Sequence, residues 1–260
     1  MREMSEDRVL SLPWNRPDRT GDKEPMIFDP IYLVIMGIGV ALSMGASWLT
    51  KSRFAHYSQI GTRSNMTGAE IAHSILRDNN IHDVSIEPVA GSLSDHYDPS
   101  SKTLRLSEPV YGGRSMAAFG VAAHEVGHAI QHATGYSMLK FRSAWVPVAN
   151  TGSRISIFVL IAAAFMGGAQ SALGGSVALA GVALFATTTV FTLVTLPVEF
   201  DASNRALAAL QGRYVTEEEY IGAKKVLNAA AMTYVAAFIT SLLTLLYWAH
   251  RLGLLGRRSD

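Results

Sequence analysis

Two histidines and a glutamate in one short run have the types and spacing of a metal-dependent hydrolase. Residues 124–128 read His-Glu-Val-Gly-His. On a helix, His124 and His128 lie on one face, where both imidazoles can reach a single ion. Glu125 then lies beside the open coordination position, where it can take a proton from a zinc-bound water whose pKa is lowered to about 7. The run predicts a zinc site with Glu125 as the catalytic base. A chance match is expected on the order of once in a hundred chains of this size.

A catalytic zinc needs a third protein ligand and one open position. The chain has no cysteine, so this ligand has to be His, Asp or Glu. A third histidine ten residues after the first is excluded, because Thr134 holds that position. Glu199 is the best candidate, since it follows a long apolar run where a carboxylate has no evident structural purpose, although an ordinary interfacial carboxylate is the plainer interpretation. Asp201 is the rival ligand, on roughly the opposite helical face.

Three more side chains near these residues could take part in catalysis or simply lie at the surface. His132 repeats the four-residue spacing, but helical drift carries it about 80° from His124, which favours a surface or supporting role over metal binding. His96 and Tyr97 belong to a turn-rich segment, residues 95–99. They are candidates for polarising the substrate carbonyl, with a plain surface turn as the alternative.

The charge distribution is typical of a membrane protein. Hydrophobic residues make up 49% of the 260 residues and charged residues 17%, whereas soluble domains carry about a quarter charged residues. Four runs contain no charged residue: 31–49, 155–169, 176–197 and 229–249. Their lengths predict membrane-spanning helices, the second extending back past Arg154, and disfavour buried helices of a soluble protein. A net charge of +1 without dense basic runs disfavours a nucleic-acid partner.

The remaining segments predict a small mixed domain. Thr67 and Glu70 have a capping-box spacing that opens a helix reaching about residue 78, and strands are expected over 83–88 and 101–106. A further helix is expected over about 115–133, carrying the histidines. Thr216 and Glu219 form a second capping box inside a polar helical segment, 199–227. An edge strand near 103–106 would hold an extended substrate.

Three segments resemble the YugP-like neutral zinc metallopeptidases of bacterial membranes: 95–99, 121–131 and 199–203. The resemblance covers about residues 30–250. It implies an integral zinc peptidase of the bacterial cytoplasmic membrane, with His124, His128 and a later Glu as metal ligands and Glu125 as the catalytic residue. A more distant similarity links the layout to HtpX-type membrane metallopeptidases, whose third ligand begins a Glu-x-x-x-Asp pattern. Here Ser203 occupies the Asp position.

Together these features predict a mostly α, multi-pass membrane protein, in which four transmembrane helices carry a small α+β zincin-like catalytic domain. The expected parts are a polar tail (1–28), a first transmembrane helix (29–50), the zincin-like domain (51–142), transmembrane helices two and three (143–197), a helical segment with the third ligand (198–228), and a fourth transmembrane helix with a basic tail (229–260).

The predicted function is that of a gluzincin-like metalloendopeptidase with one Zn²⁺ per chain, held by His124, His128 and Glu199. Because Glu199 lies just beyond an apolar run, the metal should be near the membrane surface, and the partners should be the lipid bilayer and membrane-associated or juxtamembrane polypeptide substrates. A metal-binding scaffold or chaperone, or a transporter without peptidase activity, is the alternative. Basic residues flanking the site-bearing loops favour a cytoplasmic active site, while basic residues at both termini oppose it.

Overall fold

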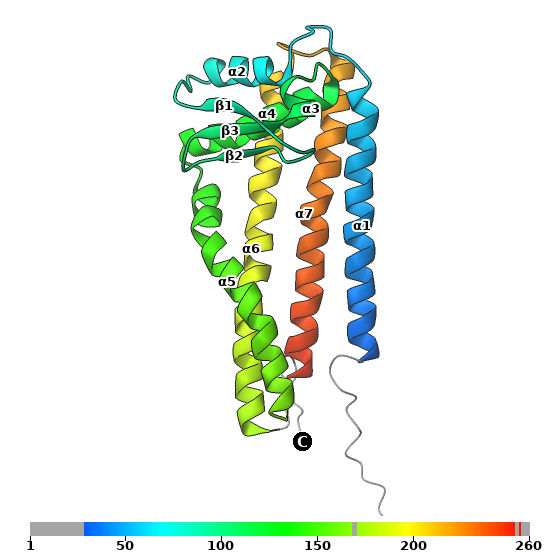
Figure 1. The fold of residues 1–260 in the computed structure, drawn as a ribbon, viewed down its shortest axis with the longest axis vertical. Helices are drawn as coiled ribbons and strands as arrows, with labels where there is room; N and C mark the ends of the chain where they lie inside the picture. The colour runs from blue at the N-terminus through cyan, green and yellow to red at the C-terminus, as the bar shows by residue number, and fades with distance from the viewer. Residues whose placement is uncertain (1–28, 168–170, 253–254, 256–260) are drawn as a thin grey trace, which may run out of the picture.

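The computed structural model of the protein describes residues 29–167, 171–252 and 255, so the predicted polar tail lies outside the described residues. Seven helices and three strands occur within this part of the chain (Figure 1). They are α1 (Pro30–Ser58), α2 (Gly68–Asp78), β1 (Ser85–Val89), β2 (His96–Asp98), β3 (Thr103–Ser107), α3 (Glu108–Tyr111), α4 (Met116–Ala133), α5 (Ser137–Phe165), α6 (Ala172–Leu210) and α7 (Glu217–Arg251).

Four helices, α1, α5, α6 and α7, are long and apolar enough to cross a membrane, which confirms the predicted fold class. They run side by side, and the sheet with α2, α3 and α4 lies at one end of them (Figure 1). Their outward side chains are strongly apolar; Trp48 is 70% exposed and Phe165 is 90% exposed. Side chains of this kind are stable on such a surface only in contact with lipid.

The helices are longer than the uncharged runs because neighbouring polar residues continue them. α6 has 39 residues, a length of about 58 Å against a hydrocarbon core of about 30 Å, so it extends well beyond the bilayer. The polar helical segment 199–227 consists of the end of α6 and the start of α7. α6 ends at Leu210, Gly212 turns the chain with a φ of 70°, and α7 begins after the capping box of Thr216 and Glu219.

Polar contacts join α1 to α7 at two levels along the helix bundle. Asp29 caps the first turn of α1, and its carboxylate also accepts a hydrogen bond from the Tyr247 hydroxyl at 2.9 Å and pairs with Arg251 at 3.0 Å. Nearer the sheet, the Thr50 hydroxyl donates to the Ala229 carbonyl at 3.0 Å. The position of α1 relative to α7 is therefore set by more than apolar packing.

The sheet has the strand order β1-β3-β2, with β1 parallel and β2 antiparallel to β3. β2 occupies residues that the sequence predicts as a turn. A strand of three residues is too short to show an alternating pattern, and it forms because His96 pairs with Arg105 across the sheet. The Asp98 carboxylate then closes the turn by accepting hydrogen bonds from Ser100 and Ser101.

This strand order shows that the predicted edge strand near 103–106 is wrong. β3 is the central strand and is paired on both sides, so its backbone cannot accept a substrate chain. The edges are β1 and β2, and no described strand pairs with the outer side of β2. β1 carries Pro88, which lacks the N–H group that strand addition requires.

α4 lies beneath the sheet and crosses the end of the helix bundle (Figure 1). Its burial is explained by a core in which Ile71 and Ile75 of α2, Leu104 and Leu106 of β3, and Phe119 of α4 are almost fully buried. Such a core removes a large apolar surface from water and fixes α4 under the sheet.

Gly127 allows the closest approach of α4 to α6. A Cβ atom at this position would lie 2.3 Å from the carbonyl oxygen of Ala202, which real contacts do not tolerate. Since Gly127 lies between the two motif histidines and Ala202 lies three residues after Glu199, this approach determines whether the two helices can share a site.

We predict that Gly127→Ala separates α4 from α6, because the added methyl group meets backbone rather than a flexible side chain. Overpacking of this kind costs about 1–3 kcal/mol, and the thermal midpoint and zinc content of the purified protein should both fall. Gly37→Ala on α1 is the matched control, since its Cβ would meet nothing within 4 Å. Equal midpoints and zinc contents for the two variants would contradict the packing argument.

Candidate metal centre

Three side chains from two helices converge where α4 crosses α6. His124 and His128 come from α4 and Glu199 from α6, and one ligand atom of each lies within 4.8 Å of the others. The Glu199 Oε2 atom is 3.3 Å from His124 Nε2 and 3.6 Å from His128 Nε2. Among the described residues this is the one group of three or more His, Asp or Glu side chains that could hold a metal ion.

The spacing and burial of these atoms fit a zinc ion. Tetrahedral zinc with bonds of about 2.0–2.1 Å separates its ligand atoms by roughly 3.3–3.4 Å. Glu199 is only 2% exposed, and its Oε2 atom is buried without a hydrogen-bond partner in the described structure. An unpartnered buried carboxylate oxygen is costly, and a cation between this oxygen and the two imidazoles would remove that cost.

The ring of His128 is oriented by a buried amide. Its Nδ1–H donates to the Gln131 side-chain oxygen at 3.0 Å, and the Gln131 NH₂ group donates to the Val198 carbonyl and to Asp201 Oδ2, both at 2.8 Å. With the proton on Nδ1, the Nε2 lone pair is free for a metal. Gln131 therefore links the His128 ring to the segment of α6 that carries Glu199.

Asp201 points away from the metal ligands. Besides Gln131, its Oδ2 atom accepts from Arg205 Nε at 2.6 Å. These contacts favour Glu199 over Asp201 as the third ligand and give Asp201 a supporting role. On the other histidine, His124 Nδ1 forms a hydrogen bond with Ser203 Oγ at 3.1 Å, in which Nδ1 would be the donor when Nε2 binds a metal. The Asp position of the HtpX-type pattern is thus filled by a hydroxyl that orients a ligand candidate.

The second carboxylate oxygen of Glu199 faces a cation from another membrane helix. Arg142 of α5 places Nη2 3.4 Å from Glu199 Oε1. From the sequence, Arg142 is only one of several basic residues beside an apolar run. Its role depends on which helices pack together, and no local sequence pattern reports that.

A cavity of about 300 Å³ is lined by His124 and Glu199 and is bounded by α1, α4, α6, α7 and the loop before β2. Glu125 lies on its wall and is only 7% exposed. Burial raises the pKa of the Glu125 carboxyl, and positive charge on the neighbouring histidines works in the opposite direction. A raised pKa suits a carboxylate that takes and returns a proton near neutral pH. Tyr234 of α7, which the sequence analysis did not single out, lines the same cavity.

His96 and Tyr97 do not line this cavity. His96 is exposed and its ring Nδ1 contacts the Ser94 carbonyl at 2.9 Å. The Tyr97 hydroxyl donates to His132 Nδ1 at 2.8 Å, so both of these side chains are paired away from the metal ligands. Burial, reinforced by the charges of nearby acidic residues, raises the pKa of Tyr97 to about 12.

Asp95 is the residue of the same segment that does reach the cavity. Its carboxylate accepts from the Ser107 backbone N–H at 2.7 Å, which fixes the loop where it enters β2. Burial raises the pKa of Asp95, and the hydrogen bonds from Ser107 oppose that rise. Asp95, rather than His96 or Tyr97, is therefore the residue of this segment that contributes to the cavity.

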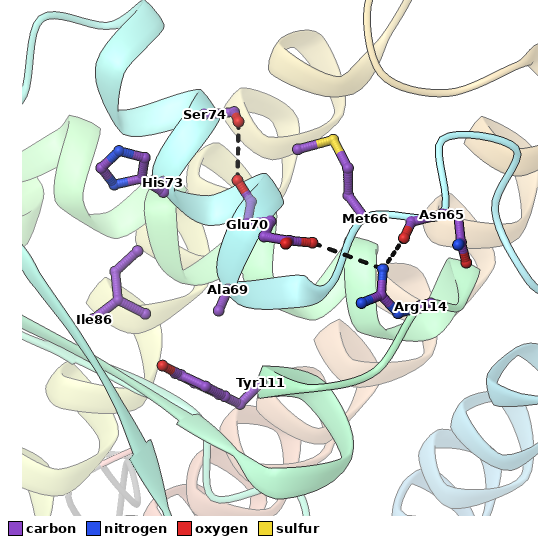
Figure 2. Close-up of a pocket in the computed structure, with 9 residues that line it drawn as sticks. All are labelled: Asn65, Met66, Ala69, Glu70, His73, Ser74, Ile86, Tyr111 and Arg114. Atoms are coloured by element: carbon purple, nitrogen blue, oxygen red, sulfur yellow. Dashed lines mark hydrogen bonds and ion pairs between the residues drawn. The ribbon is translucent and has the colours of Figure 1, made fainter.

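A second hollow, of about 640 Å³, lies between α2 and β1 (Figure 2). It is wide open, and its charged groups are already paired. Arg114 contacts the Asn65 carbonyl and lies 3.8 Å from Glu70, whose carboxylate also accepts from the Thr67 N–H in the capping box. It shares no residue with the metal-ligand group, which remains the candidate site.

Comparisons with known proteins identify the family of the chain. The chain matches the family described as "Putative neutral zinc metallopeptidase" over residues 32–252, which include the three candidate metal ligands and Glu125. It is also similar to the "Putative membrane protease YugP" of Bacillus subtilis (strain 168), with 46% identity over 219 residues that cover 83% of this chain and 93% of that protein. No solved structure matches the chain. The chain therefore belongs to the neutral zinc metallopeptidase family, as its resemblance to YugP-like proteins predicted.

Proposed function

We propose that the protein is a gluzincin-like zinc metalloendopeptidase that hydrolyses membrane-associated or juxtamembrane polypeptides. The observation that carries this proposal is the convergence of His124, His128 and Glu199 beside a cavity whose wall includes Glu125. One Zn²⁺ per chain would occupy the space between the three ligand atoms. Bound there, zinc makes a water molecule more acidic and polarises a carbonyl group.

Glu125 moves the proton in this proposal. Its carboxylate takes a proton from the attacking water as the new C–O bond forms at the scissile carbonyl. It then gives this proton to the amide nitrogen as the C–N bond breaks, so that Glu125 ends the cycle ionised. The buried position of its side chain supports this role, because burial brings its pKa closer to the pH at which it works.

We assign the stabilisation of the carbonyl oxygen to Tyr234 rather than to His96 or Tyr97. Tyr234 lines the cavity together with Glu125 and Glu199 and interacts with the Glu199 carboxylate, so its phenol is beside the metal ligands, whereas the Tyr97 hydroxyl is bound to His132. A hydrogen-bond donor directed at the developing oxyanion typically contributes about 10²–10³ in rate. Arg142 has a different role, because it contacts the candidate metal ligand Glu199 and holds it in place.

The position of the cavity supports a substrate at the membrane surface. Its walls include Ser47 of α1 and Ala230, Ala231 and Thr233 of α7, all within uncharged stretches of those helices. Asp95 brings the lead-in to β2 to the same cavity, and β2 is the sheet edge without a proline. We therefore infer that an extended substrate aligns along β2.

We place the active site on the cytoplasmic side of a bacterial cytoplasmic membrane. Lys51, Lys140, Lys224 and Lys225 all lie towards the end of the bundle that carries the sheet, and the positive-inside rule assigns such an end to the cytoplasm. Arg251 at the other end counts in the opposite direction and is outnumbered by the four lysines.

Glu125→Gln should retain zinc near one ion per chain and lose cleavage by a hundredfold or more, because a carboxamide cannot act as a base. Zinc content and cleavage of a denatured membrane protein, each with and without chelator, measure both properties. Glu108→Gln, an exposed glutamate on α3, is the control. Unchanged cleavage by Glu125→Gln would remove its assigned role. A wild-type protein that binds zinc without chelator-sensitive cleavage would indicate a scaffold or a transporter.

Glu199→Ala and Glu199→Gln should purify with little zinc, since two histidines alone make a weak site. Asp201→Ala should keep zinc with an affinity lowered about 10–100-fold, as is typical when a group that supports a ligand is lost. The glutamine variant keeps the shape of the side chain, so it separates loss of the metal from loss of the fold. Zinc analysis after dialysis measures the difference, and the reverse order would transfer the ligand role to Asp201.

Tyr234→Phe should lower kcat about 100-fold or more while zinc content and KM stay near their wild-type values, because it removes one donor to the oxyanion. Tyr97→Phe is the matched control and should leave kcat nearly unchanged, since its hydroxyl serves His132. The opposite result, a large loss of kcat for Tyr97→Phe alone, would restore the prediction made from the sequence.

A further inference from the structure

The mouth of the metal-site cavity is marked by the few lining residues that are exposed. These are Ser47 and Lys51 of α1, one helical turn apart, and Leu93 in the loop before β2. The other lining residues are buried or half-buried. A substrate that reaches Glu125 therefore has to pass between this face of α1 and the Leu93 loop.

Charge is unevenly distributed around this cavity. Three carboxylates line it, those of Asp95, Glu125 and Glu199, and Lys51 is the one lysine or arginine on its wall. Within the described part of the chain, Lys51 forms no hydrogen bond or ion pair. Its ammonium group thus has no protein partner among the described residues, although the carboxylates of Asp95, Glu125 and Glu199 line the same cavity.

Lys51 is held at the entrance by a fixed segment of α1. The preceding residue, Thr50, contacts the Ala229 carbonyl of α7 at 3.0 Å and also lines the cavity. Arg53, two residues further along, is exposed and does not line the cavity. A separation of two residues corresponds to about 200° of helical rotation, which places Arg53 on roughly the opposite face.

Leu93 on the other side of the entrance has an unusual backbone. Its φ is 56°, in the left-handed region that bulky side chains seldom adopt, and its side chain is 38% exposed. Backbone strain of this kind persists where the surroundings impose it and is frequent at ligand-binding sites. The entrance therefore presents an apolar contact on the loop side and a cation on the helix side.

We propose that Lys51 is a specificity-determining residue that binds a carboxylate of the polypeptide substrate, while Leu93 contacts an apolar side chain of the same substrate. The carboxylate comes from an acidic side chain near the scissile bond or from the chain terminus. This inference rests on the proposed peptidase function and narrows its substrate class to acidic peptides.

Matched peptides test the proposal on the full-length, zinc-loaded protein in detergent. The set consists of quenched-fluorescent peptides that differ only by Glu, Gln or Lys at each position around the cleavage site, each with a free or an amidated C-terminus. Ion pairs with an exposed lysine are weak, so the expected preference for Glu over Gln is roughly twofold to fivefold in kcat/KM. The amidated peptides distinguish a side-chain carboxylate from a terminal one.

Variants of the two basic residues on α1 provide the decisive comparison. Lys51→Gln should abolish the preference by raising KM for the acidic peptide with little change in kcat, and Lys51→Glu should favour the Lys peptide instead. Arg53→Gln and Arg53→Glu should keep the wild-type preference. A wild-type protein indifferent to peptide charge, or Arg53 variants that shift the preference equally, would overturn the assignment. A Lys51 effect that is the same for every peptide would also overturn it and would indicate contact with lipid headgroups.

Binding of the same peptides to zinc-loaded Glu125→Gln, followed by fluorescence anisotropy, separates this inference from the proposed function. If the acidic peptides bind selectively through Lys51 but the wild-type protein cleaves none of them, the proposed peptidase function is refuted. The proposed role of Lys51 in binding is then retained. Cleavage without charge selectivity would support the proposed peptidase function and refute the role of Lys51 in specificity.

Discussion

The buried carboxylate of Glu199 is the interaction on which the arrangement of this protein depends. It lies in the outer part of a membrane helix, where Arg142 of α5 pairs with one of its oxygens and the other oxygen faces the two histidines of α4, between which a metal ion would balance its charge. A buried charge that loses its partners typically costs about 3–5 kcal/mol. The metal site is therefore one of the places where α4 is attached to the bundle, and Gly127 makes it possible by letting α4 approach α6.

Elements defined by local signals could be predicted from the sequence. The uncharged runs identify all four long helices, and the capping boxes at Thr67 and Thr216 mark where α2 and α7 begin. β2 and the order of the strands could not be predicted, because three residues show no periodicity and pairing is a non-local property. The same reason explains why an edge strand was expected at the position of β3, which lies in the centre of the sheet.

The residues of the candidate site also differ in whether local sequence patterns could predict them. His124, Glu125 and His128 follow from their spacing on one helix, and Glu199 follows from its place after an apolar run. Tyr234 could not be found in this way, since it reaches the cavity only because α7 packs beside α6. Tyr97 is a candidate because of its place in the turn-rich segment 95–99, yet its hydroxyl contacts His132, which lies one helical turn beyond His128. Sequence patterns locate ligands on a helix, whereas the groups around a substrate depend on packing between helices.

The cavity beside the metal site exists only when the long helices are packed together. The cavity has α1 and α7 as walls, and these two helices are joined through Thr50 near the site and through Asp29 at the far end of the bundle. A chain in which α1 has not packed against α7 possesses the histidine motif but lacks the wall that carries Lys51. Because a water-poor, enclosed site strengthens the electrostatic interactions that stabilise a transition state, such a chain would be a poor catalyst even with metal bound. Under the proposed function, packing of α1 against α7 would therefore complete the active site.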